Sequence, residues 1–348
     1  MSCYLEMAAL GGALMKILFI GGTGTISMAI TRLLAERGEE LYLLNRGSRN
    51  DDLPDNVHLI RCDINDEAEV AKKLEGKKFD CVGEFIGFVP SQLERDYRLF
   101  AGKTGQFIYI SSASAYRKPM QGYVITEETP LENPYWQYSR DKKACEEYLM
   151  ERYREDGFPV TIVRPSHTYD ERSVPLGVHG KNGSWQVVKR IREGKPVIIH
   201  GDGTSLWTIT HNSDFAKAYV GLIGNPDAIG EAFHITTDES VSWNEIYGYI
   251  AKTLGVELKS CHVSSDTLAK LGPDYDFVGS LIGDKANSVV FDNSKVKKLV
   301  PRFKAEVSAE EGIRRTVEYV LSHKECQQDD EEFDKWCDEV IAKVTSIK

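Results

Sequence analysis

The chain has 348 residues, a formal net charge of −10 at pH 7 and a charged fraction of 28%. This length suits one large domain or two medium ones, and the acidic balance argues against a broad nucleic-acid-binding surface. No uninterrupted apolar run is long enough to cross a bilayer. The seven cysteines are scattered, without a C-x-x-C pair. We therefore expect reduced thiols, a cytoplasmic location and no structural metal site.

Residues 1–14 (MSCYLEMAALGGAL) lack the basic leading region of a secretory signal. We expect them to form a disordered extension, with the fold beginning at Met15. From there, short apolar runs alternate with segments of helical spacing. The runs lie at 15–20, 40–47, 57–64, 79–88, 105–116 and 159–165, and the helical segments at 28–38, 67–76, 91–102 and 138–154. This alternation predicts an α/β fold with a doubly wound parallel sheet of the Rossmann type.

The pattern changes after Pro165. A loop-like segment leads to a predicted helix at 184–195, and residues 196–211 read as two short strands around a glycine turn. Beyond residue 242 the chain is mostly helical. We predict a smaller, mostly helical substrate-binding domain with a C-terminal helix, and we divide the chain as follows: the dinucleotide-binding domain spans 15–170 and 211–237, and the substrate domain spans 171–210 and 238–348.

GGTGTIS, residues 21–27, joins the first strand to the first helix. Glycines let the backbone turn tightly and approach a pyrophosphate, which the free N–H groups of a helix N-terminus stabilise. A small Ser27 lets the helix pack closely. A tight turn that binds no ligand could have the same glycine pattern, but the position between strand and helix favours nucleotide binding. The predicted cofactor contacts here are Gly21, Gly24, Thr25 and Ile26.

The second strand should end beside the adenosine ribose, where an acidic residue would favour NAD(H). The sequence has Asn45 and Arg46 there, with no acid. A guanidinium suits a phosphate or stacks on adenine; the alternative is a solvated arginine in a turn. We favour NADP(H) as cofactor, with NAD(H) as the alternative. The third strand ends at Asp63 and Ile64, where the carboxylate either accepts from the adenine amino group or lies in a surface turn.

The fifth strand ends in a serine-rich segment that includes Ser112, and Tyr138 and Lys142 follow on the next helix. Spacing of four residues places the phenol and the ammonium on one helix face. A nearby ammonium and a cationic nicotinamide should lower the pKa of Tyr138. The phenol could then exchange a proton with a substrate hydroxyl or carbonyl while hydride moves to or from the nicotinamide. A serine hydroxyl bonded to the same oxygen would orient the substrate.

Together these motifs resemble the extended short-chain dehydrogenase/reductases usually called NAD-dependent epimerase/dehydratases, from Met15 to the C-terminal helix. The motifs that carry the resemblance are GGTGTIS, ISSASAY, YSRDK, VRPSHTYD, GDGTSLWTITHNSDFAKA and GEAFHIT. The resemblance implies that the catalytic residues are Ser112, Tyr138 and Lys142. The cofactor contacts that it adds are Tyr138, Lys142, Pro165 and His167.

The chain also departs from the family pattern. Glu84 to Gly87 replace a common H-L-A-A, and Trp207 stands where nucleotide-sugar enzymes generally place a diphosphate-binding arginine. Tryptophan stacks on a sugar but cannot pair with a phosphate, which disfavours a nucleotide sugar. Glu84 reads equally as a substrate-side acid or as a core residue held by backbone donors. The candidate substrate contacts are Ser114, Glu84, His167, Trp207 and His211.

We therefore expect an NAD(P)-dependent oxidoreductase or epimerase that acts on a hydroxyl or keto carbon of a sugar-like or other small polar substrate. The alternative is a non-catalytic nucleotide-sensing or RNA-binding module, because the resemblance extends to plastid RNA-binding relatives that tend to lack an intact catalytic pair. We expect no nucleic-acid or membrane partner. The family pairs two helices in a dimer, which implies a homodimer here. The apolar residues assigned to its seam are Leu93, Tyr97, Phe100, Cys145, Tyr148, Leu149 and Tyr153.

Overall fold

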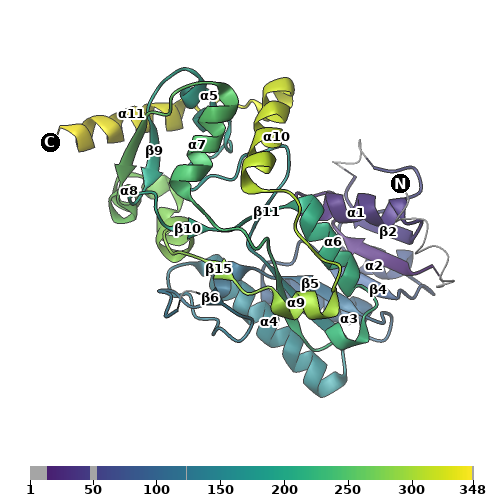
Figure 1. The fold of residues 1–348 in the computed structure, drawn as a ribbon. Helices are drawn as coiled ribbons and strands as arrows, with labels where there is room; N and C mark the ends of the chain where they lie inside the picture. The colour runs from purple at the N-terminus through teal and green to yellow at the C-terminus, as the bar shows by residue number, and fades with distance from the viewer. Residues whose placement is uncertain (1–13, 48–52, 123, 347–348) are drawn as a thin grey trace.

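The structure, a computed structural model, describes residues 14–47, 53–122 and 124–346 (Figure 1). The predicted N-terminal extension lies outside the described residues, apart from the exposed Leu14. Seven parallel strands form the central sheet in the order β12-β7-β5-β4-β1-β2-β3. The strands are β1 (Lys16–Ile20), β2 (Glu40–Asn45), β3 (His58–Arg61), β4 (Cys81–Glu84), β5 (Phe107–Ile110), β7 (Val160–Pro165) and β12 (Ala232–Ile235). The predicted doubly wound Rossmann-type sheet is confirmed.

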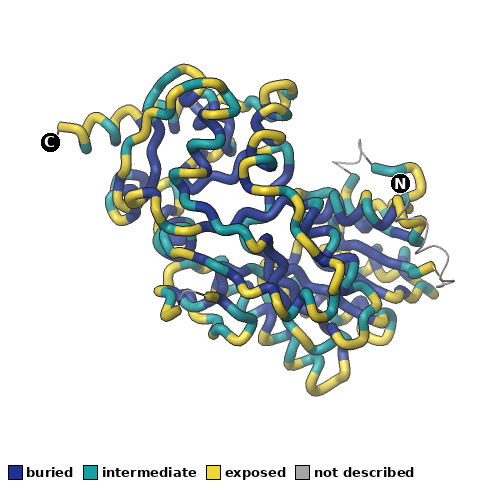
Figure 2. Tube along the Cα trace, viewed as in Figure 1, coloured by how far each residue is buried: buried dark blue, intermediate teal, exposed yellow. Residues whose placement is uncertain are grey.

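The central strands are buried on both faces, as Figure 2 shows. Along β1, Ile17 and Phe19 join one apolar core, and Leu18 and Ile20 join the other, because alternate side chains of a strand point to opposite faces. Helices cover both faces and complete these cores. They are α1 (Ser27–Glu36), α6 (Asn212–Leu222) and α9 (Ser294–Leu299) on one face, and α2 (Glu67–Lys73), α3 (Pro90–Phe100) and α4 (Gln137–Asp156) on the other.

A third core occupies the C-terminal part of the molecule and draws mostly on 171–210 and 238–348. Its helices are α5 (Trp185–Arg192), α7 (Trp243–Leu254), α8 (Ser265–Leu271), α10 (Ala309–Ser322) and α11 (Glu331–Thr345). A π-helix (Val278–Lys285) follows α8. Among the described residues, every helix is too short or too polar to cross a bilayer.

Short strand pairs also form separate two-stranded sheets outside the central sheet. They are β8 (His167–Tyr169) with β11 (Ile209–His211), β9 (Val197–His200) with β14 (Ser260–Val263), β10 (Leu206–Trp207) with β13 (Val241–Ser242), and β6 (Val124–Ile125) with β15 (Val290–Phe291). We predicted two strands around the glycine turn at 196–211. The structure has three there, each paired with a strand from elsewhere in the chain.

Most of the apolar seam assigned to a dimer packs inside the subunit. The side chains of Leu93, Phe100, Cys145 and Leu149 are 0% exposed and belong to the core between α3, α4 and the sheet. The prediction was wrong for these four, because the apolar face of each helix is the face that packs on the sheet. The three tyrosines of the predicted seam remain partly exposed.

Candidate active site

The glycine loop lies between β1 and α1. Gly21 and Gly22 have φ angles of 101° and 93°, a region that side chains rarely adopt. A Cβ on Gly22 would also come within 2.5 Å of Leu43. The Thr31 hydroxyl donates to the Gly22 carbonyl at 2.8 Å, and the Gly24 N–H donates to the Ser27 hydroxyl at 2.9 Å. The loop is therefore held in a defined shape above the first turn of α1.

A groove of about 680 Å³ runs along the carboxyl ends of β1, β2, β3, β4 and β5, where ligands bind in doubly wound sheets. Nearly all the predicted catalytic and cofactor residues line it. They are Gly21, Gly24, Thr25, Ile26, Asn45, Arg46, Asp63, Ile64, Ser112, Tyr138, Lys142 and Pro165. The remaining one, His167, lines an adjoining cavity. The structure thus brings segments far apart in sequence together along one groove.

Lys142 is fixed by backbone carbonyls at the floor of this groove. Its ammonium donates to Gly87 O at 2.7 Å and to Ile110 O at 2.8 Å, which leaves one of its three N–H donors for a ligand. The nitrogen lies 5.8 Å from the centroid of the Tyr138 ring. Burial lowers the pKa of Lys142 to about 8. Lysine and tyrosine therefore face the same volume, as predicted from their spacing.

The hydroxyl of Tyr138 is favoured in its protonated form by its protein surroundings. Burial raises the pKa of Tyr138, a hydrogen bond with Ser112 opposes this shift, and the Asp284 carboxylate adds to it. The protein's own groups thus shift this pKa upward, whereas the lowering that we predicted combined the neighbouring ammonium with a cationic nicotinamide. The main cause is burial of the phenol, because desolvation disfavours the charged phenolate.

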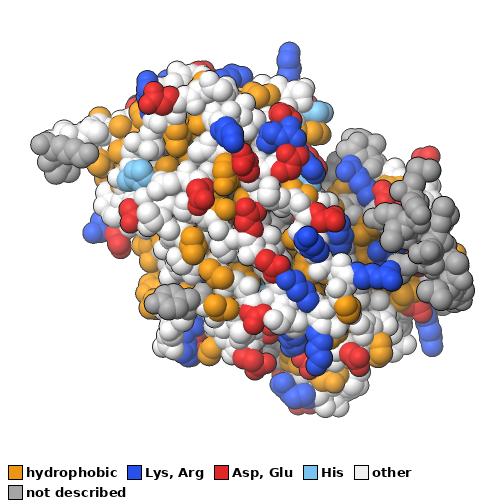
Figure 3. Space-filling model, in the orientation of Figure 1, with side chains coloured by type: hydrophobic (Ala, Val, Ile, Leu, Met, Phe, Trp, Pro, Cys, Tyr) orange, Lys and Arg blue, Asp and Glu red, His pale blue; other side chains and the backbone are white. Residues whose placement is uncertain are grey.

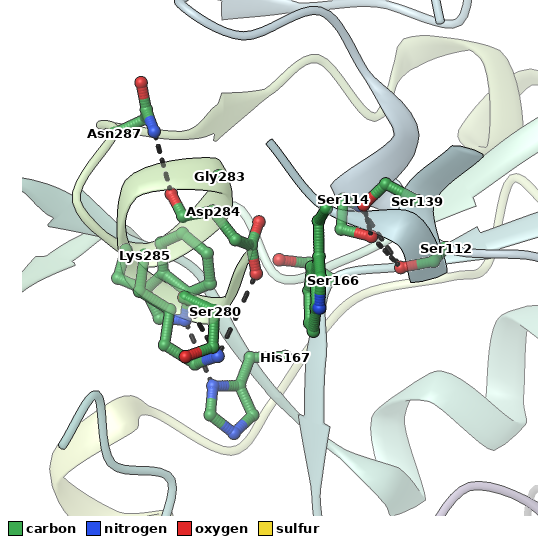
Figure 4. Close-up of polar contacts among 12 residues, drawn as sticks. Ser112, Ser114, Ser139, Ser166, His167, Ser280, Gly283, Asp284, Lys285 and Asn287 are labelled. Carbon is green, nitrogen blue, oxygen red and sulfur yellow. Dashed lines mark hydrogen bonds and ion pairs between the residues drawn. The ribbon is translucent and has the colours of Figure 1, made fainter. Parts of the chain in front are cut away.

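A chain of serine hydroxyls supports Ser112. Ser112 Oγ lies 2.9 Å from Ser114 Oγ, which accepts a hydrogen bond from Ser139 at 2.8 Å (Figure 4). Asn133 donates to the carbonyl of Ser114 at 2.8 Å and to that of Gly283 at 2.6 Å. Sequence reasoning did not identify Ser139 or Asn133. The only signal was the position of Ser139 directly after Tyr138 in the YSRDK motif.

A smaller cavity of about 280 Å³ adjoins the groove at Ser112, Tyr138, Pro165 and Ser166. Aromatic, serine and charged side chains form its other walls. They come from Ser114, Trp136, His167, Trp207, Asp284, Lys285 and Phe291. Three of the predicted substrate residues, Ser114, His167 and Trp207, therefore line this cavity. Asp284 and Lys285 were missed, because no motif precedes them in the sequence.

The polar edge of Trp207 is directed to His167. The indole N–H donates to His167 Nδ1 at 3.1 Å, which assigns the imidazole proton to Nε2. Burial lowers the pKa of His167 to about 3, so this side chain is neutral. The Trp207 ring packs on Trp243 with a centroid distance of 5.4 Å. The position that would hold an arginine for a diphosphate is therefore a rigid aromatic wall.

Glu84 and His211, which we predicted as substrate contacts, line neither cavity. The structure shows a physical reason for each. Glu84 is 0% exposed and accepts from the Ile86 N–H, and burial together with the Asp96 carboxylate raises its pKa. Of the two readings of Glu84, the core residue is the one the structure shows. His211 caps α6 by accepting from the Ser213 N–H at 3.3 Å, so its ring is directed at the helix.

A sequence model of the NAD dependent epimerase/dehydratase family matches residues 17–236. The chain is 22% identical over 289 residues to 2'-dehydrokanamycin reductase of Streptomyces kanamyceticus, covering 83% of this chain and 80% of that one. It is 26% identical over 253 residues to the chloroplast stem-loop binding protein of 41 kDa b of Arabidopsis thaliana, covering 69% and 63%. Its fold is similar to that of UDP-glucuronic acid 4-epimerase from Bacillus cereus in complex with NAD, with a TM-score of 0.69, 19% identity and 90% and 100% coverage.

Proposed function

Because the chain belongs to the NAD dependent epimerase/dehydratase family, we propose that it transfers hydride between NADP(H) and a hydroxyl or keto carbon of a small sugar-like substrate, with Tyr138 as general acid–base. The family and the relatives support an NAD-dependent epimerase/dehydratase or reductase that acts on a sugar-related compound. One observation carries the finer proposal: Ser112 and Tyr138 lie where the long groove and the small cavity meet.

The residues present fit the cofactor. The glycine loop would hold the pyrophosphate, Asn45 and Arg46 the adenosine ribose, and the remaining N–H of Lys142 the nicotinamide ribose. When bound, the nicotinamide supplies or accepts the hydride. Tyr138 then donates a proton to the substrate carbonyl oxygen or takes one from its hydroxyl, and Ser112 hydrogen-bonds to the same oxygen. Lys142 stabilises the phenolate that forms when the proton leaves.

The surroundings of Tyr138 favour the form of the phenol that can donate a proton. Burial and Asp284 raise the pKa of the phenol, so at neutral pH it carries the proton that a carbonyl oxygen needs during reduction. The named activity of the Streptomyces relative is also a reduction. A test is to monitor the reduced-nicotinamide absorbance while the protein is mixed with NADPH and a panel of keto sugars. We expect oxidation of NADPH with at least one of them; a protein inert toward the whole panel in both directions would contradict the proposal.

The Arabidopsis relative gives the rival function, a stem-loop-binding module. Two features favour an enzyme instead. The chain retains Ser112 and Tyr138 at the cavity junction and Lys142 in the adjoining groove. On the face in Figure 3, acidic and basic side chains are interspersed, and the net charge is −10, whereas RNA-binding surfaces gather lysine and arginine.

Cofactor preference depends on Arg46, which is exposed and lines the groove beside Asn45. A 2′-phosphate would receive charge-assisted hydrogen bonds there that NAD(H) cannot accept. Such bonds contribute about 1.5–3 kcal/mol each, so we expect Arg46→Ala to weaken NADP(H) binding by about ten- to a hundredfold. NAD(H) binding should change much less. The measurement is a titration of both cofactors, followed by tryptophan fluorescence.

Arg37→Ala removes an exposed arginine at the end of α1, outside the groove, and should leave both affinities unchanged. Added salt should weaken the binding of NADP(H) more than that of NAD(H), because the contact between Arg46 and the 2′-phosphate lies near the surface. Equal weakening of both cofactors in Arg46→Ala would assign Arg46 to adenine stacking. A wild-type protein that prefers NAD(H) would contradict the proposed preference.

We also propose a homodimer through the outward faces of α3 and α4. Tyr97 and Tyr148 pack edge to face on that surface, with a centroid distance of 6.5 Å, and Arg152 lies 5.8 Å from each ring. Partly exposed aromatic and arginine side chains are enriched at interfaces. Light scattering at micromolar concentration should give twice the chain mass, and a monomer mass would remove this proposal.

A further inference from the structure

The π-helix (Val278–Lys285) places two charged side chains in the wall of the small cavity. Asp284 and Lys285 lie across the cavity from Ser112 and Ser114, as Figure 4 shows. The side chains of Asp284 and Lys285 are each 13% exposed. A π-helical turn shifts the register of its side chains and often marks a functional site. Here the shift presents consecutive charged residues to the same volume.

Among the residues that the structure describes, the hydrogen-bond and ion-pair partners of the Lys285 ammonium lie at long distances. Its nitrogen lies 3.5 Å from Ser280 O and 4.0 Å from Asp284 Oδ2, both at the outer limit of a useful interaction. The face of Trp136 lies 5.8 Å away. An ammonium has three donors and binds strongly at about 2.7–2.9 Å. Lys285 therefore retains the capacity to bind an anion that enters the cavity.

Lys118 adds a second positive charge behind this wall. It is 3% exposed, and its nitrogen has no hydrogen-bond partner among the described residues. It interacts electrostatically with Asp284, as Lys285 does. Lys118 and Lys285 thus both interact with the Asp284 carboxylate, and the Asp276 carboxylate also acts on Lys285. Unpaired buried charge is costly, so an anion in the cavity would stabilise the two ammoniums.

We propose that Lys285, supported by Lys118, is the binding site for a carboxylate of the substrate, which makes the substrate a small sugar acid. This rests on the proposed function, which places the reacting carbon at Tyr138. The cavity of about 280 Å³ lies at the lower limit for small-molecule sites. Its other walls include the rings of Trp136, Trp207 and Phe291. These dimensions suit one sugar ring with a carboxylate and leave no cationic fork for a diphosphate.

The test compares acid and neutral sugars by isothermal titration calorimetry on the Tyr138→Phe protein saturated with NADP⁺, where binding is separated from turnover. The probes are glucuronate with glucose, galacturonate with galactose, and gluconate with sorbitol. At least one acid should bind about ten- to a hundredfold more tightly than its neutral partner, the range for a charge-assisted contact. Lys285→Met should abolish that difference, and Lys285→Arg should retain most of it.

Asp284→Asn provides a second test, in which the affinity for the sugar acid should rise instead of fall. It removes the carboxylate that competes for Lys285, so acid binding should become tighter. Lys335→Met, at a side chain 80% exposed on α11, is the matched control and should change nothing. The proposal is overturned if no acid binds better than its neutral partner, if Lys285→Met keeps the preference, or if Asp284→Asn weakens acid binding. Tighter binding of glucose 6-phosphate than of any acid would also overturn it. A protein that binds these acids but turns over no substrate would contradict the catalytic role of Tyr138. The proposed carboxylate site would be unaffected, because the binding measurements do not require turnover.

Discussion

Replacing Tyr138 with phenylalanine is expected to lower kcat by about 10²–10⁴-fold, the usual contribution of a general acid–base group, while the fold and cofactor affinity remain near those of the wild type. Only the phenolic oxygen is lost. The ring keeps its packing against Trp136 and Phe88, at centroid distances of 5.0 Å and 6.5 Å. Steady-state kinetics with a substrate from the keto-sugar panel, together with cofactor titration, gives both quantities.

Tyr135→Phe is the matched control, because Tyr135 is a nearby tyrosine that is 41% exposed and lines neither cavity. This variant should retain wild-type turnover. Full activity in Tyr138→Phe would remove the catalytic assignment. Equal loss in both variants would show that the kinetic effect does not depend on the phenol at the cavity junction.

The second large effect concerns stability. Arg164 at the end of β7 donates to both carboxylate oxygens of Glu146 on α4, at 2.7–3.2 Å, and the two side chains are 8% and 4% exposed. Arg164 also donates to the hydroxyl of Tyr116 at 3.1 Å. The pair ties the helix that carries Tyr138 and Lys142 to the strand that ends at the cofactor groove. The pair therefore affects function by holding Tyr138 and Lys142 in position at the groove.

Glu146→Ala should reduce the free energy of unfolding by about 3–5 kcal/mol, because it leaves the Arg164 guanidinium buried without a counterion. Urea denaturation measures this change. Replacing both partners, as Glu146→Leu with Arg164→Met, should recover much of the loss, since no unpaired charge remains. The control is Glu318→Ala, whose pair with Arg314 is about half exposed and should contribute less than about 1 kcal/mol. A loss of that small size in Glu146→Ala would contradict the account.

The seven-stranded sheet could be predicted because its strands are buried on both faces and so read as apolar runs between helical segments. The glycine loop and the Tyr138–Lys142 pair could be predicted because local spacing specifies their geometry. By contrast, Asp284 reaches the cavity through a π-helix in the third core, a placement that depends on long-range packing. Glu84 reads as a site residue because it ends a central strand, yet its side chain turns to Asp96, and sequence alone does not report that rotation.

The dimer seam was misassigned for a related reason. The apolar positions of α3 and α4 follow helical spacing, and the sequence does not say whether such a face meets a sheet or a second subunit. In the structure, Leu93 and Leu149 meet the sheet. Of the residues in the predicted dimer seam, the three partly exposed tyrosines remain accessible to a partner subunit.

Native mass spectrometry of the purified protein, combined with absorbance at the reduced-nicotinamide band, tests the central claim most directly. We expect one nicotinamide dinucleotide per chain and, after addition of a substrate that is turned over, a small sugar-like product whose appearance changes that absorbance. A protein that carries RNA or no nicotinamide dinucleotide, even when NADP(H) and NAD(H) are supplied, would contradict it.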